Sequence, residues 1–210
     1  MHLTALPHVL SFFALTALIA LPAAAAQGDD PDWPCIQRKV PELSLGQVWN
    51  GPELPKLAAD WARDPVVASL VQEIAARRVP VPQAQEKIRA FGQRLSAGDR
   101  NSHLSMLVQG LFDHMNAERS DVIAGIARYA HRQRDMAALL RREAAAVDAL
   151  RANSDMDQAD VAQRNERLIF QTRVFQERAQ SLAFVCEVPT LIEQRLYALA
   201  KTIDAMLEQK

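Results

Sequence analysis

The sequence has little of what all-β folds and phosphate-binding loops require. Only 7 of its 210 residues are glycine, and only 6% are aromatic. Because β-sandwiches and barrels depend on aromatic and β-branched strands joined by many tight turns, this composition argues against an all-β fold. The sequence also lacks a P-loop motif and a G-x-S-x-G motif, so it does not indicate a nucleotide site or a serine hydrolase.

An excess of one charge is also missing. The 24 Lys and Arg residues are balanced by 25 Asp and Glu residues, which gives a formal net charge of −1. Since nucleic-acid binding depends on a basic surface, we expect no nucleic-acid partner. The hydrophobic content of 49% is too high for an intrinsically disordered chain and is sufficient for one folded domain.

Proline is absent from a long part of the sequence. Eight prolines lie between residues 31 and 82, and the next is Pro189. Proline favours extended and turn conformations and interrupts helices. The sequence therefore predicts an extended, proline-rich N-terminal arm over residues 27–57 and an all-α helical bundle domain over residues 58–210.

Caps and hydrophobic periodicity divide the bundle into six expected helices. Asp64 and Pro65 are typical of an N-cap followed by a first-turn proline. Ser120 is interpreted as the N-cap that separates the third helix from the fourth. The expected helices cover residues 65–78, 82–96, 99–118, 120–151, 157–187 (or 155–187) and 190–208.

The last three expected helices carry heptad spacing, which is typical of left-handed bundles and antiparallel coiled coils. A short turn at residues 153–156 makes two of them a long antiparallel helical hairpin. In this register Val122 faces Cys186, and Glu143 faces Asn165. We interpret the Glu143–Asn165 pair as a buried polar layer that fixes the register, with a ligand site as the alternative.

The N-terminal segment predicts export. Residues 9–21 form an apolar run, and Ala24 and Ala26 follow in the A-x-A pattern of a signal-peptide cleavage site. The run is shorter than a membrane span requires. We predict a signal peptide over residues 1–26, cleavage near Ala26, and a periplasmic or secreted chain without a transmembrane segment. An uncleaved N-terminal anchor is the alternative.

Two cysteines, Cys35 and Cys186, remain after this cleavage. Paired cysteines in exported chains tend to be oxidised, so we predict a Cys35–Cys186 disulfide that joins the arm to a helix far along the chain. A free thiol or an intermolecular disulfide is the alternative. No C-x-x-C motif is present to indicate a redox site.

The arm begins with the sequence D-W-P-C-I-Q-R-K-V-P over residues 32–41. This start resembles that of uncharacterised small secreted bacterial proteins, chiefly alphaproteobacterial, and the resemblance implies no activity and no site. From the residues themselves, the arm either packs across the bundle or forms a strap that binds a protein partner. The candidate partner-binding residues are Trp33, Gln37, Arg38, Lys39 and Trp49.

The sequence shows no cofactor, metal or catalytic site. His114 and Glu118 are spaced as two metal ligands on one helix, but a structural metal site needs about four. We therefore expect a non-enzymatic periplasmic interaction protein: an adaptor, a chaperone or an accessory subunit of an envelope complex. Its partner is expected to be an envelope protein or a second copy of the chain. The alternative function is a helical-bundle sensor or carrier for a small ligand or metal.

Overall fold

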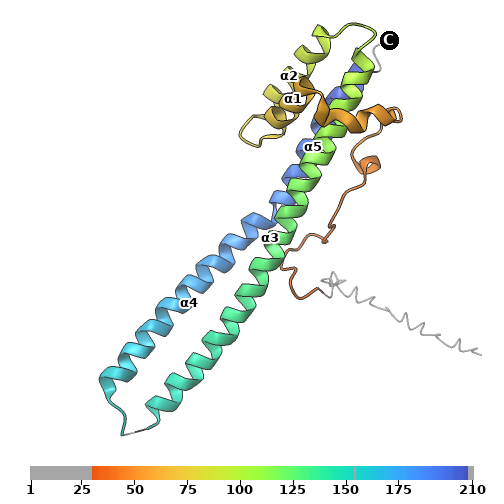
Figure 1. The fold of residues 1–210 in the computed structure, drawn as a ribbon. Coiled ribbons are helices and arrows are strands. Elements are labelled where there is room, and N and C mark those ends of the chain that lie inside the picture. Colours follow the sequence, from red (N-terminus) through yellow and green to blue (C-terminus); the bar gives the residue numbers. More distant parts are fainter. Residues whose placement is uncertain (1–29, 154, 208–210) are drawn as a thin grey trace, which may run out of the picture.

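The structure is a computed structural model that describes residues 30–153 and 155–207, and within them the chain forms helices and no β-strand (Figure 1). The predicted all-α fold is therefore confirmed. The elements are η1 (Leu45–Gln47), η2 (Lys56–Arg63), α1 (Pro65–Ala75), α2 (Val81–Arg94), α3 (Arg100–Arg151), α4 (Gln158–Cys186) and α5 (Val188–Leu207). The predicted signal peptide and its cleavage site lie outside the described residues. In the described part, no helix combines the length and the apolar character needed to cross a membrane.

Two of the predicted N-caps form as expected. The Oδ1 atom of Asp64 accepts hydrogen bonds from the backbone N–H groups of Val66 and Val67, at 2.9 and 3.0 Å. Asp157 accepts from the N–H of Ala159 at 2.9 Å and begins α4. These caps form because the first N–H groups of a helix have no intrahelical acceptor, so a short acidic side chain can satisfy them.

The predicted break at Ser120 is wrong. Residues 100–151 form one helix of 52 residues, so its length is about 78 Å at a rise of about 1.5 Å per residue. Ser120 lies inside this helix, and its hydroxyl donates to the carbonyl of Pro41 in the arm at 3.0 Å. The helix continues because nothing near Ser120 interrupts it, and Met115, Arg119 and Ile123 remain on its buried face.

The helix ends also differ near Pro189. The predicted interruption at this residue shrinks to Glu187 alone, and α5 begins at Val188. Pro189 then occupies the first turn of α5, where a missing N–H group costs no hydrogen bond. As a result α4 and α5 follow each other almost directly, with a bend between them (Figure 1).

The main hydrophobic core lies at one end of the molecule, which we call the head. It is formed by α1, α2, η2, the first part of α3, and α5. Gly110 in α3 permits close packing with η2 and α1, since an added Cβ would lie 2.8 Å from both the Trp61 ring and the Val71 side chain. Fully buried side chains from the four α-helices of the head include Ile74, Ile88, Leu104, Leu107, Leu111, Ile192, Leu196, Leu199 and Ile203.

A buried cation closes one end of α1. The guanidinium of Arg195 in α5 donates to the carbonyl of Ile74 from Nε at 3.2 Å and from Nη2 at 2.6 Å. The Ile74 carbonyl belongs to the last turn of α1 and lacks a helical partner. Burial lowers the pKa of Arg195, and the Glu118 carboxylate acts in the opposite direction.

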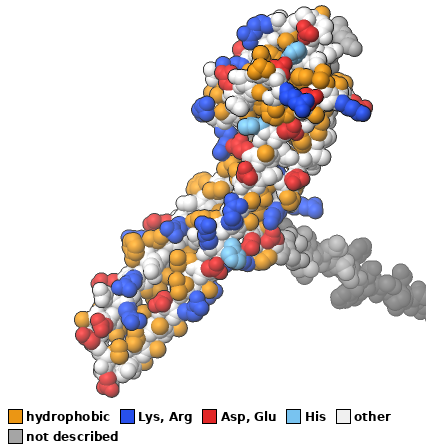
Figure 2. All heavy atoms as spheres, viewed as in Figure 1, with side chains coloured by type: hydrophobic (Ala, Val, Ile, Leu, Met, Phe, Trp, Pro, Cys, Tyr) orange, Lys and Arg blue, Asp and Glu red, His pale blue; other side chains and the backbone are white. Residues whose placement is uncertain are grey.

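The rest of α3 and α4 form the predicted antiparallel hairpin, which projects away from the head (Figures 1 and 2). Its register agrees with the prediction near Cys186, because Val122 packs against the buried cluster that contains Cys186 and Ile126. Towards the tip, Leu140, Val147 and Val161 are buried along the seam between the two helices. Apolar contacts of one helix pair therefore hold the hairpin together beyond the head.

The predicted polar layer of Glu143 and Asn165 is wrong. Glu143 is exposed, whereas its neighbour Ala144 is half-buried. Asn165 is half-buried, and its side-chain oxygen accepts a hydrogen bond from Arg151. A straight helix drifts by about 20° per heptad relative to a strict 3.5-residue repeat, so the inward position moves from residue 143 to residue 144.

Candidate functional site

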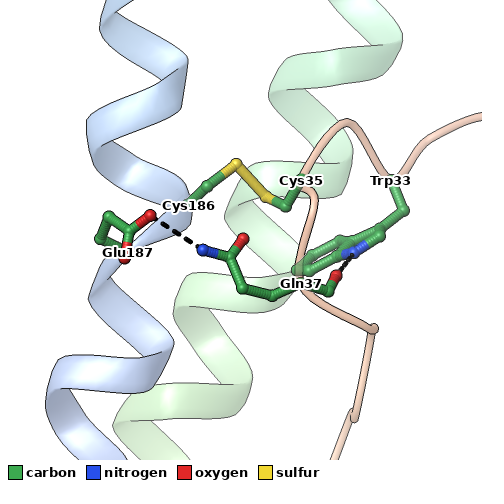
Figure 3. Close-up of a disulfide and its surroundings, with 5 residues drawn as sticks. All are labelled: Trp33, Cys35, Gln37, Cys186 and Glu187. Atoms are coloured by element: carbon green, nitrogen blue, oxygen red, sulfur yellow. Dashed lines mark hydrogen bonds between the residues drawn. A yellow bond between two sulfur atoms is a disulfide. The ribbon is translucent and has the colours of Figure 1, made fainter. Parts of the chain in front are cut away.

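The predicted disulfide between Cys35 and Cys186 is present (Figure 3). Its sulfur atoms are 2.03 Å apart and its Cα atoms 5.5 Å apart, across a sequence separation of 151 residues. Both cysteines are buried and pack against Ile126 of α3. The disulfide therefore fixes the arm at the point where α4 bends into α5.

Polar contacts hold the arm on both sides of the disulfide. The indole Nε1 of Trp33 donates to the carbonyl of Gln37 at 2.6 Å, which closes a local turn. The side-chain amide of Gln37 donates to Glu187 at 2.8 Å, directly beyond Cys186 (Figure 3). Lys39 pairs with Asp30 at 2.6 Å, and its ammonium group lies 5.8 Å from the centre of the Trp33 ring.

The Lys39–Asp30 contact changes the acidity of Asp30. The hydrogen bond from Lys39 lowers the pKa of the Asp30 carboxyl below its ordinary value of 3.8, and the backbone N–H of Asp32 adds to this effect. Asp32 in turn contacts α3: its Oδ1 atom lies 2.5 Å from Arg134 and 3.3 Å from His131. The start of the described arm is therefore bound to the hairpin by charge.

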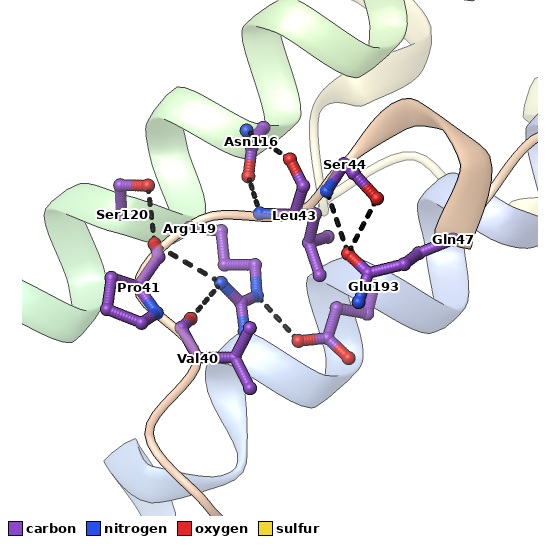
Figure 4. A network of polar contacts seen from close by, with 9 residues as sticks. All are labelled: Val40, Pro41, Leu43, Ser44, Gln47, Asn116, Arg119, Ser120 and Glu193. Atoms are coloured by element: carbon purple, nitrogen blue, oxygen red, sulfur yellow. Dashed lines mark hydrogen bonds and ion pairs between the residues drawn. The ribbon is translucent and has the colours of Figure 1, made fainter.

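A second group of contacts holds the arm near the head (Figure 4). Arg119 of α3 is 2% exposed, and its guanidinium donates to the carbonyl of Val40 and to the carboxylate of Glu193 in α5, each at 2.6 Å. Asn116 exchanges hydrogen bonds with the backbone of Leu43, at 3.1 and 3.4 Å. Asn116 and Arg119 therefore form hydrogen bonds with backbone groups of the arm, not with its side chains.

These contacts bear on the prediction that the arm forms a strap that binds a protein partner. Of the predicted partner-binding residues, Arg38 is exposed, while Trp33, Gln37 and Lys39 are half-buried and contact other parts of the same chain. Trp49 is 7% exposed and belongs to the head core, where its indole donates to the carbonyl of Pro52. The expectation that Trp49 faces a partner is therefore wrong, because its ring fills core volume. Partner binding by the others remains a prediction.

Sequence reasoning missed several exposed apolar side chains. Ile36 follows Cys35 and is 95% exposed. Two further groups lie on α4 and α5: Ile169 and Phe170 on the hairpin, and Phe184, Val185 and Leu191 around the bend. In Figure 2, hydrophobic side chains lie among charged ones along the hairpin. The heptad pattern on the buried seam gave no signal for these residues, since they lie outside it.

Glu143 lines a shallow groove on the hairpin instead of a buried site. The groove has a volume of about 450 Å³. Its other lining residues are Asp160, Gln163, Arg164, Arg167, Leu168 and Gln171. Both signs of charge are present, and most of these side chains are exposed. The groove therefore does not support a ligand site at Glu143 and Asn165.

Metal ligation finds no support in the geometry. Across residues 30–153 and 155–207, no group of three or more His, Cys, Asp and Glu side chains is placed to hold an ion. The Glu118 carboxylate forms an ion pair with Arg77 at 3.2 Å, so its observed partner is a cation and not a metal site shared with His114.

No protein-family model, curated protein or solved structure matches this chain.

Proposed function

We propose that this chain is a non-enzymatic interaction protein of the periplasm or the extracellular space, in which the head supports the α3–α4 hairpin and the hairpin binds a protein partner. The buried disulfide and the absence of a membrane-spanning helix from the described residues are compatible with an exported protein. Within this proposal, the chain acts as an adaptor, a chaperone or an accessory subunit of an envelope complex.

The observation that carries the proposal is the pair Ile169 and Phe170. They are neighbours on α4, beyond the head core, with exposed fractions of 61% and 66%. Single exposed apolar residues are ordinary on protein surfaces, whereas exposed apolar patches with a polar rim mark interaction sites. Charged neighbours, Glu166, Arg167 and Arg173, would form the polar rim of such a surface.

The hairpin is well suited to present this surface. Since α3 runs without a break from the head core to the hairpin tip, the position of the hairpin is fixed by the packing of the head. The seam of the hairpin uses its own apolar residues, including Leu140 and Val161, so Ile169 and Phe170 are not needed for its folding. They remain available to a partner.

Site-specific photocrosslinking tests the proposal. A photoreactive amino acid at exposed Arg173, one turn from Phe170, is expected to crosslink the exported chain to a discrete protein, and Ile169→Glu or Phe170→Glu is expected to abolish that product. Val66→Glu is the matched control, because Val66 is 61% exposed but lies on α1 in the head. A product of twice the chain mass identifies a second copy as the partner.

The proposal is overturned if the crosslinked product survives both hairpin substitutions, or if Val66→Glu reduces it to the same extent. Circular dichroism of each variant separates loss of binding from loss of folding.

A further inference from the structure

A second surface feature lies on the head, away from the hairpin. It is a cavity of about 550 Å³ between α2 and α5, beside the first residue of α3. This volume is within the range of small-molecule sites, about 300–1,000 Å³. Residues of all three helices line it.

The charge of this lining has one sign. Arg89, Arg100 and Lys201 contribute three cations, and none of the described residues that line the cavity carries a carboxylate. Arg89 is 3.3 Å from Glu86, and both side chains are largely exposed, so this pair is weak. Within the described residues, no ion pair involves Arg100 or Lys201. The cavity therefore has an excess positive charge.

Arg100 provides a second, independent observation. Its Nε atom is buried and has no hydrogen-bond acceptor in the described part of the chain. A buried N–H group of a cation that lacks an acceptor is costly, and such groups are rare in native structures. Arg100 also lines the cavity, so a shift of its side chain towards an acceptor bound there would satisfy this group.

The remaining walls can accommodate carbon atoms. Ala198, Ala205 and Met206 give α5 an apolar strip along the cavity, and Tyr197, which is 45% exposed, also lines it. Thr202 and Gln85 both donate to the carbonyl of Ala198, at 3.0 and 3.3 Å, so these side chains are held in place. The lining thus combines fixed polar groups with an apolar surface.

We propose that this cavity binds a small organic dianion, a phosphate monoester or a dicarboxylate. Arg100 and Lys201 bind the anionic groups, and the α5 strip contacts the carbon part. Arginine and lysine bind such groups through charge-assisted hydrogen bonds, which are the stronger ones in proteins. This site is separate from the hairpin surface of the proposed function, so each can fail without the other.

Calorimetric titration of the folded, oxidised chain at low ionic strength tests the site. Phenyl phosphate, phthalate and inorganic phosphate serve as three probes, because the first two share the dianion and the apolar part. At least one organic probe is expected to bind, and Arg100→Gln and Lys201→Met are each expected to weaken it about tenfold or more. The control variants Arg63→Gln and Lys56→Met remove exposed cations outside the cavity and are expected to leave binding unchanged.

Ala205→Phe provides a test without any change of charge. Ala205 is exposed and lines the cavity, so a larger side chain fills the space without disturbing the core, and binding of the organic probes is expected to disappear. Binding of inorganic phosphate alone, unaffected by this variant, would mean an adventitious ion only and overturn the site. Absence of binding by both organic probes, or equal weakening by Lys56→Met and Lys201→Met, also overturns it.

Discussion

The Nε atom of Arg119 in α3 lies 2.6 Å from the carboxylate of Glu193 in α5, directly beneath the arm. The same guanidinium donates to the carbonyl of Val40, so one buried side chain joins three segments that are far apart in the sequence (Figure 4). Because the side chain of Glu193 is 35% exposed, solvent weakens the ion pair itself, and the bond to the arm carries much of the effect.

Arg119→Met is therefore expected to destabilise the chain by at least about 2 kcal/mol, since it leaves a backbone carbonyl and a carboxylate without their donor. Urea unfolding followed by circular dichroism measures the change. Arg63→Met is the control, because Arg63 is exposed and pairs with Asp60 within η2, where the expected cost is below about 0.5 kcal/mol. Equal costs for the two variants would contradict the assigned role of Arg119.

Removal of the disulfide is expected to lower the free energy of unfolding strongly. Cys35→Ser combined with Cys186→Ser releases a closure across 151 residues, for which the chain-entropy relation gives an upper value of about 5 kcal/mol. The head core contains neither cysteine, so its helices are expected to stay folded. Urea unfolding measures the loss, and a loss under about 1 kcal/mol would show that the noncovalent contacts alone hold the arm.

The position of the hairpin seam gives a third prediction. Ala144→Glu is expected to loosen the hairpin by about 1 to 3 kcal/mol, because it places a charge at a half-buried position between the helices. Glu143→Ala is expected to change stability by less than about 0.5 kcal/mol, since Glu143 is exposed. Hydrogen exchange of the α4 amides measures both effects locally, and the reverse order would restore Glu143 to the seam.

The acidity of Asp30 gives a fourth prediction. Its pKa in the folded chain lies below 3.8, so the Lys39 contact stabilises the arm above that pH. The contribution is lost as the pH falls from 3.8 through the lower, folded value. Carboxyl NMR titration is expected to show this low pKa, and Lys39→Met is expected to return it towards 3.8. Lys56→Met is the control. An Asp30 pKa that is the same with and without Lys39 would contradict the contact.

Local sequence signals predicted the helices well, because their physical causes are local. Asp64 and Asp157 cap helices through N–H groups two or three residues away, and the hairpin register near Cys186 follows from heptad spacing. The prediction failed at Ser120 because nothing near this residue interrupts the helix, and its hydroxyl donates to the carbonyl of Pro41 in the arm instead of capping a helix. Serine is typical of helix starts, but Ser120 here connects α3 with the arm.

The arm was the least predictable part for the same reason. Gln37 finds its partner Glu187 across 150 residues, so its half-buried position could not be read from the neighbouring sequence. Trp49 and Trp33 share a segment, yet one fills the head core and the other closes a turn beside the disulfide. The one-residue error at Glu143 arose from a strict 3.5-residue repeat, which accumulates drift along a straight helix.

The placement of Cys186 at the end of α4 orders the assembly of the molecule. During synthesis from the N-terminus, Cys35 of the arm has no disulfide partner until both helices of the hairpin, α3 and α4, have been made. The helix that completes the head core follows Cys186, since α5 supplies Ile192, Leu196, Leu199 and Ile203. The growing chain therefore carries an unpaired Cys35 until Cys186 has been made, and its head core is completed only by the helix that follows.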